Sequence, residues 1–136
     1  EAGFVVVADR YTLTQVVRET IRGGDTDWIE SLYANIPKPD ATVILQAGSR
    51  RLLNRILFGE ELQSLNHFEA GMDLNFSSSI TTSFLNYQKK ISKKFSKLAD
   101  EQGLPIIPTR DSVENVHKHI WKEILPEIED MLQPLS

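Results

Sequence analysis

The stretch that decides the expected fold is G-F-V-V-V-A-D-R-Y, residues 3–11 of the chain. Its continuous apolar run over Gly3–Ala8 is largely β-branched and predicts a strand buried on both faces, which is typical of a parallel sheet. Polar side chains follow at once, from Asp9 to Tyr11. Ligands of open parallel sheets bind beyond the carboxyl ends of the strands, so these side chains are the first candidates for a functional site.

Apolar runs and helical spacing alternate along the rest of the chain. Residues 60–78 show no clean period and are expected to form a lid-like loop. The order of elements predicts a single α/β domain over residues 1–136, with three parallel strands and helices on both faces of the sheet. The two further strands are predicted over residues 41–46 and 104–107. The helices are predicted over residues 13–21, 28–36, 49–58 and 79–102, and from Asp111 or Ser112 onward with a kink or restart at Pro126.

Composition excludes several classes of protein. The 136 residues contain no Cys, which excludes disulfide frameworks and Cys-based zinc or iron–sulfur sites. Fifteen basic residues against 19 acidic ones give a net charge of −4, so no broad electropositive surface is expected to recruit nucleic acid. The apolar runs are too short to span a bilayer, and no signal-peptide pattern is present. We therefore expect a cytoplasmic protein with neither nucleic acid nor membrane as a partner.

Two charged pairs suggest anion binding. The Asp9 carboxylate can organise a metal-bound water, and the Arg10 guanidinium can clamp a phosphate through two parallel hydrogen bonds. A surface ion pair is an equally open interpretation of this pair. Arg18 and Arg22 are four residues apart and share a helix face, where an anion would relieve their repulsion. Solvated arginines are nevertheless the favoured interpretation of that second pair alone.

The remaining charged groups are less specific. Arg51 and Arg55 also share a helix face and either reach a phosphate or pair with Glu60 and Glu61. Neither G-x-G-x-x-G nor G-x-x-x-x-G-K-[ST] occurs in the sequence. Lysines cover the polar side of the long predicted helix, where a solvated face is the favoured interpretation; they are Lys89, Lys90, Lys93, Lys94 and Lys97.

Taken in order, a set of short motifs resembles the thymidylate kinase family over nearly the whole chain. The F-E-A-G-M-D-L element, residues 68–74, is similar to the archaeal and bacterial thymidylate kinase-like branch. The other motifs are V-V-V-A-D-R-Y (5–11), R-E-T-I-R-G-G (18–24), D-W-I-E-S-L-Y (27–33), K-P-D-A-T-V-I-L (38–45), L-N-R-I-L (53–57) and S-F-L-N-Y-Q (83–88).

The resemblance implies a P-loop nucleoside monophosphate kinase fold that transfers the γ-phosphoryl group of ATP to dTMP with Mg²⁺. It implies a catalytic role for Asp9, which would serve the metal indirectly, for Arg10 at the acceptor phosphate, and for Arg55 at the entry to the lid. Acceptor-nucleotide positions fall on Tyr11, Thr14, Gln15, Arg18 and the neighbouring Arg22, with Gln15 placed to read the pyrimidine edge. Adenine-lining positions fall on Thr109, Arg110 and Asp111.

The sequence departs from that family pattern at several points. Gln46 stands where an acidic residue is frequent, and Glu60 and Glu61 stand where the lid is usually basic. The phosphate-binding loop is missing, together with the strand expected between the strand that ends at Asp9 and the strand at 41–46. Each buried backbone group left unpaired costs about 1–3 kcal/mol. We therefore expect the first two strands to close up or swap between chains, or a missing amino-terminal P-loop segment to lie elsewhere.

These considerations make the chain a carboxyl-terminal portion of a thymidylate kinase-like enzyme, starting at Glu1 rather than Met. Its expected partners are dTMP or a related nucleoside monophosphate, and the missing P-loop segment or a second copy of the chain. ATP and Mg²⁺ are cofactors expected of the parent enzyme, whereas this chain alone is expected to bind neither tightly and to be inactive. The alternatives are a degenerate, non-catalytic module that assembles as a dimer, and a kinase for another nucleotide, suggested by Arg18 at the sugar-discriminating position.

Overall fold

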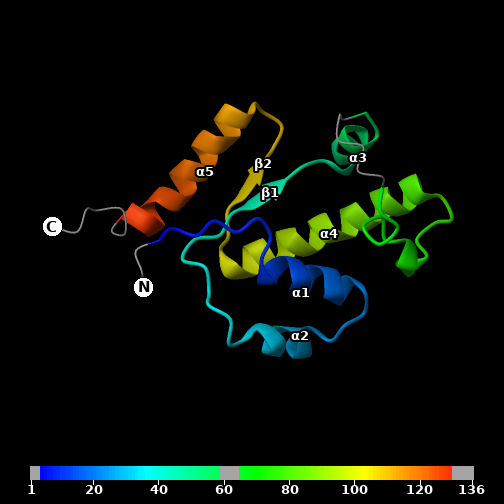
Figure 1. The fold of residues 1–136 in the computed structure, drawn as a ribbon, viewed down its shortest axis with the longest axis horizontal. Helices are drawn as coiled ribbons and strands as arrows, with labels where there is room; N and C mark the ends of the chain where they lie inside the picture. Colours follow the sequence, from blue (N-terminus) through cyan, green and yellow to red (C-terminus); the bar gives the residue numbers. More distant parts are fainter. Residues whose placement is uncertain (1–3, 59–64, 130–136) are drawn as a thin grey trace. The chain divides into compact units, whose positions relative to one another are not determined.

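The computed structural model describes residues 4–58 and 65–129 (Figure 1). The chain divides into two compact units, residues 1–37 and residues 38–136. The single α/β domain expected from the sequence stays a prediction.

The first unit is a pair of helices, α1 (Thr12–Ile21) and α2 (Thr26–Tyr33). Val17 of α1 and Ile29 of α2 are buried, and they supply the apolar contact that the helical spacing predicts. The connection between the helices is tight. A Cβ atom added to Gly24 would lie 2.7 Å from the Ile29 side chain, and the Asp25 carboxylate caps α2 by accepting from the Trp28 N–H at 2.8 Å.

The prediction of a first strand over residues 3–8 is wrong for residues 4–8, the part that the structure describes. Residues 4–8 form no strand, and Phe4, Val5, Val6 and Val7 are 84%, 70%, 84% and 91% exposed. A strand exists only where another strand meets its backbone N–H and C=O groups, and among residues 4–58 and 65–129 none pairs with this segment. The apolar run therefore has strand propensity without a partner, and three strands are not confirmed.

The second unit is built on two parallel strands, β1 (Ile44–Gln46) and β2 (Ile106–Pro108). Ile44 pairs with Ile106 and Gln46 with Pro108, so both strands end at the same edge. Their side chains Ile44 and Ile107 are buried. The predicted strands at 41–46 and 104–107 are confirmed in position and direction, with shorter or shifted bounds.

Helices α3 (Ser49–Phe58), α4 (Ile80–Gln102) and α5 (Val113–Ile128) complete this unit. In Figure 1 the strand pair lies between α4 and α5, and α4 contacts β1 while α5 contacts β2. The α5 helix runs through Pro126 to Ile128 rather than ending at the proline. None of the helices in the described part of the chain is both long and apolar enough to cross a membrane.

Part of the predicted lid-like loop packs tightly against α4. It contains a short 3₁₀ helix, η1 (Met72–Leu74), preceded by Gly71 in the left-handed conformation. The Ser83 hydroxyl, fully buried on α4, donates to the Ala70 carbonyl at 2.9 Å. A Cβ atom on Gly71 would lie 2.8 Å from the buried Tyr87 ring. Ala70, Gly71 and η1 thus pack on α4, while residues 60–64 lie outside the described residues and the lid-like loop stays a prediction.

Candidate functional site

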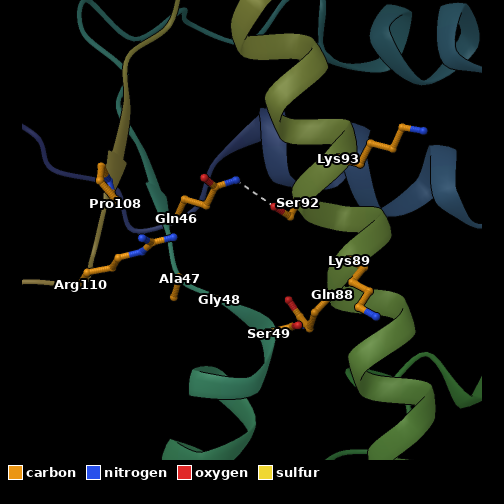
Figure 2. A pocket seen from close by; sticks show the side chains of 10 residues that line it. All are labelled: Gln46, Ala47, Gly48, Ser49, Gln88, Lys89, Ser92, Lys93, Pro108 and Arg110. Carbon is orange, nitrogen blue, oxygen red and sulfur yellow. Dashed lines mark hydrogen bonds between the residues drawn. The ribbon is translucent and has the colours of Figure 1, made fainter.

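A pocket of about 360 Å³ opens at the carboxyl ends of β1 and β2, where a parallel sheet is expected to bind its ligand (Figure 2). It is bounded by the ends of both strands, the beginning of α3 and one face of α4. The residues that line it are Gln46, Ala47, Gly48, Ser49, Gln88, Lys89, Ser92, Lys93, Pro108 and Arg110.

Gln46 is fixed in this pocket by hydrogen bonds to two other elements. Its side-chain Nε2 donates to the Ser92 hydroxyl at 2.8 Å, with the Ser96 hydroxyl at 3.5 Å, so its amide nitrogen faces α4. Its backbone carbonyl accepts from the Thr109 N–H at 2.9 Å and the Thr109 hydroxyl at 3.3 Å. Gln46 therefore links the end of β1 to α4 and to the loop after β2.

Sequence reasoning noticed Gln46 but missed its partners on α4. Gln88, Ser92 and Ser96 recur every four residues and so share a helix face. These uncharged polar side chains stand beside the lysines that were interpreted as a solvated face, and two of those lysines, Lys89 and Lys93, line the pocket. The spacing of Gln88, Ser92 and Ser96 could have indicated a polar contact on this face of α4. Periodicity alone does not say which strand end that face meets.

The three predicted adenine-lining residues have different surroundings. Thr109 is half-buried, donates a hydrogen bond to the Gln46 carbonyl and is not among the residues that line the pocket. Arg110 lines the pocket, and Figure 2 shows its side chain extending from the end of β2 toward Ala47. Asp111 is exposed and is not among the lining residues.

Asp111 instead lies at the start of α5. The Asn115 side chain and then the Ser112 backbone N–H donate to its carboxylate and lower the pKa of Asp111 below its ordinary value of 3.8. The second of these bonds is 2.8 Å long. Asp111 thus precedes the N-cap residue Ser112 and is held by hydrogen bonds at the start of α5.

Arg55 lies in the last turn of α3 and is exposed. It does not line the pocket at the strand ends. A basic side chain in the last turn of a helix is favoured by the helix dipole, so the place of Arg55 has a structural reason.

The remaining predicted site residues belong to the first unit. Arg10 has a φ of 67°, in the left-handed region that non-glycine residues seldom adopt. The next residue, Tyr11, is anchored because its hydroxyl donates to the Pro37 carbonyl at 3.1 Å. The α1 helix begins directly after it, with the Thr14 N–H donating to the Tyr11 carbonyl. The exposed Asp9 and Arg10 are thus carried on a bent segment at the start of α1.

One face of α1 gathers the predicted acceptor residues. Thr14 and Arg18 are one turn apart, Gln15 lies beside them, and Arg22 follows Arg18 at the end of the helix, where its Nη1 donates to the Arg18 carbonyl at 3.4 Å. The buried residues of α1, Val16 and Val17, lie on the opposite side. The helix periodicity therefore groups these polar side chains on one face, and their role at an acceptor site stays a prediction.

Among the described residues, carboxylates and histidines form no metal-binding cluster at the strand-end pocket or at the start of α1. No group of three or more His, Cys, Asp or Glu side chains that could hold a metal ion occurs within residues 4–58 and 65–129. Asp9 is the carboxylate predicted to serve Mg²⁺ indirectly. Mg²⁺ keeps several waters and takes one or two carboxylates together with phosphates, so the exposed Asp9 fits such a water-mediated role.

Comparison with known proteins points to one family. The family model described as thymidylate kinase matches residues 1–120. The chain is 32% identical over 103 residues to a probable thymidylate kinase 2 of Saccharolobus solfataricus, which covers 76% of this chain and 47% of that protein. It is 28% identical over 121 residues to a probable thymidylate kinase of Thermococcus kodakarensis, covering 88% of this chain and 51% of the relative. A thymidylate kinase of Arabidopsis thaliana is 23% identical over 138 residues, covering 100% of this chain and 45% of the plant protein. The chain spans about half the length of the curated relatives it matches.

Proposed function

This chain belongs to the thymidylate kinase family, and we propose that it forms the acceptor-nucleotide-binding and lid-bearing part of an enzyme that phosphorylates dTMP to dTDP with ATP. The family has a P-loop NTPase α/β fold, acts on dTMP, and in general uses ATP and Mg²⁺. The finer assignment to this chain rests on the geometry of its first unit.

The observation that carries the proposal is the backbone of Arg10. A left-handed conformation costs a non-glycine residue roughly 1–2 kcal/mol, and such strain concentrates at functional sites. Here it falls on an arginine between Asp9 and the anchored Tyr11, directly before the polar face of α1. A guanidinium fixed at that point can take the two oxygens of an acceptor phosphate.

The other side chains have complementary roles in this proposal. Gln15 is exposed on α1 and carries both a donor and an acceptor, which a pyrimidine edge requires. Thr14, Arg18 and Arg22 line the same face, and Tyr11 holds the segment that presents Arg10. Arg55 is proposed to neutralise phosphate charge from α3, and Thr109, Arg110 and Asp111 stand on the ATP side.

Phosphoryl transfer is catalysed mainly by positioning and by electrostatic stabilisation. Bound Mg²⁺ would offset charge on the phosphates, and Asp9 would orient a water of its coordination shell. Arg10 would fix the acceptor phosphate so that its oxygen stays in line with the transferring group.

Calorimetric titration with dTMP tests the proposal. Arg10→Ala should weaken dTMP binding by about tenfold or more, because a charge-assisted hydrogen-bond pair is lost. Lys38→Ala, which removes an exposed cation outside the first unit, should leave the affinity unchanged. Titrations with dUMP, CMP and UMP identify the preferred base and sugar. Equal affinities of the Arg10→Ala variant and the unmodified chain would remove Arg10 from the site.

A further inference from the structure

The pocket at the strand ends has an unusual charge for a protein of net charge −4. Three of its lining side chains are cationic: Arg110, Lys89 and Lys93. The other polar side chains that line it are the neutral Gln46, Gln88, Ser49 and Ser92. No carboxylate is found among the described residues that line this pocket. Its local potential is therefore positive and favours an anion.

The three cations are not equivalent in Figure 2. The Arg110 side chain extends across the mouth of the pocket, from the end of β2 toward the residues that follow β1. Lys89 and Lys93 extend from α4 away from the strands in this view. Of the three cations, Arg110 therefore extends toward the strand ends, while the two lysines add positive charge along α4.

These residues do not fit a protein-held magnesium ion. Mg²⁺ binds to proteins through one or two carboxylates, and the strand-end position here is occupied by a neutral amide. The Gln46 nitrogen is already engaged with Ser92, which leaves only its carbonyl oxygen for a ligand. A divalent cation would also be repelled by the three nearby positive charges.

Because the pocket is positive and its lining residues do not fit a magnesium ion, we propose that the pocket binds a polyphosphate chain through direct contact with Arg110. No metal ion is held by the protein in this arrangement. A volume of about 360 Å³ is within the usual range of ligand pockets and accommodates a triphosphate. The same chemistry is presented by a nucleoside triphosphate and by free inorganic polyphosphate. If the ligand is the triphosphate of ATP, the inference rests on the proposed function; if the ligand is free polyphosphate, it does not.

Calorimetry on the full chain, with EDTA or with excess Mg²⁺, tests this with tripolyphosphate and with ATP. Both anions should bind in EDTA, and Arg110→Ala should weaken that binding by about tenfold or more. Lys93→Ala should weaken it by about two- to fivefold, since its side chain lines the pocket but extends away from the strands. Lys97→Ala is the matched control, because Lys97 lies one turn further along α4, pairs with Glu101 at 3.5 Å and does not line the pocket.

Comparing ATP with tripolyphosphate shows whether the ligand is a nucleoside triphosphate or free polyphosphate. Tighter binding of ATP than of tripolyphosphate assigns the pocket to a nucleotide, and equal affinities assign it to free polyphosphate. Either result supports the proposal if Arg110→Ala weakens the binding by about tenfold or more. Binding that requires Mg²⁺, binding that Arg110→Ala leaves intact, or no binding of either anion would overturn it.

Gln46→Glu supplies a second, opposite test. The Gln46 nitrogen donates to the Ser92 hydroxyl in the native chain, and the new carboxylate can instead accept from that hydroxyl once it turns; circular dichroism checks that the fold is retained. It should weaken tripolyphosphate binding in EDTA by about tenfold, and Mg²⁺ should restore part of the loss. An unchanged affinity in EDTA would contradict the charge argument. None of these titrations involves dTMP or Arg10, so failure here and failure of the proposed function are distinguishable.

Discussion

At the scale of single residues, Gly71 and Arg10 are the two positions where a left-handed backbone is best explained by what surrounds it. Gly71 has a φ of 65° and lies against the Tyr87 side chain, so glycine is required both for the conformation and for the space. Arg10 adopts a φ of 67° without glycine's freedom. In the first case the conformation serves packing, and in the second we infer that it serves phosphate binding.

Gly71→Ala should therefore destabilise the chain strongly. The added Cβ would lie 2.8 Å from Tyr87 Cγ and 2.9 Å from Tyr87 Cβ, and Tyr87 is fully buried. We expect a loss of about 2–4 kcal/mol in the free energy of unfolding, from overpacking together with the left-handed backbone. Urea denaturation measures it.

Gly103→Ala is the matched control for that substitution. Gly103 has a φ of 66° but nothing within 4 Å of an added Cβ. Only the backbone cost of about 1–2 kcal/mol should remain. If Gly71→Ala and Gly103→Ala lowered the free energy of unfolding equally, the close packing of Gly71 against Tyr87 would not contribute to stability.

At the scale of elements, the start of α5 is stabilised by a small network at its amino end. The Ser112 hydroxyl accepts from the Asn115 N–H at 3.3 Å, while Asp111 accepts from the Asn115 side chain and the Ser112 N–H. These bonds favour the ionised carboxylate, which is why the pKa of Asp111 is lowered.

A pH titration by NMR should find the pKa of Asp111 below 3.8, and Asn115→Ala should return it toward that value. Because the folded-state pKa is the lower one, the stabilising contribution is complete above the unfolded-state pKa. It is lost as the pH falls through the folded-state pKa. Asn54→Ala, on α3, is the control that should leave the titration unchanged. A pKa of Asp111 that Asn115→Ala does not move would exclude this network.

The elements also show where local signals were sufficient. Helix α4 was predicted over 79–102 and spans Ile80–Gln102, with the Ser79 hydroxyl accepting from the Thr82 N–H and Gly103 in the left-handed conformation at its end. Both ends are set by residues within the helix's own neighbourhood, which is what a sequence records. The segment at 4–8 failed for the opposite reason, because a strand depends on a partner that its own residues do not supply.

At the scale of the whole chain, the parallel direction of β1 and β2 and their shared carboxyl edge were predictable, whereas their direct pairing and the contents of the pocket were not. Parallel strands joined by helices imply a shared carboxyl edge, and that edge is where the pocket lies. The contact between Gln46 and Ser92 joins residues 46 positions apart, and it depends on how α4 crosses the strand end. Periodicity gives the face of a helix but not the element that this face meets.

The central claim is that this polypeptide receives the phosphate of dTMP at the beginning of α1. Titration of the ¹⁵N-labelled chain with dTMP, followed by amide chemical shifts, tests it most directly. We expect the shifts to concentrate at Asp9, Arg10 and Tyr11 and along the polar face of α1, at Thr14, Gln15 and Arg18. Absence of any shift at millimolar dTMP, or shifts confined to residues outside 9–22, would contradict the claim and favour a non-catalytic assembly module.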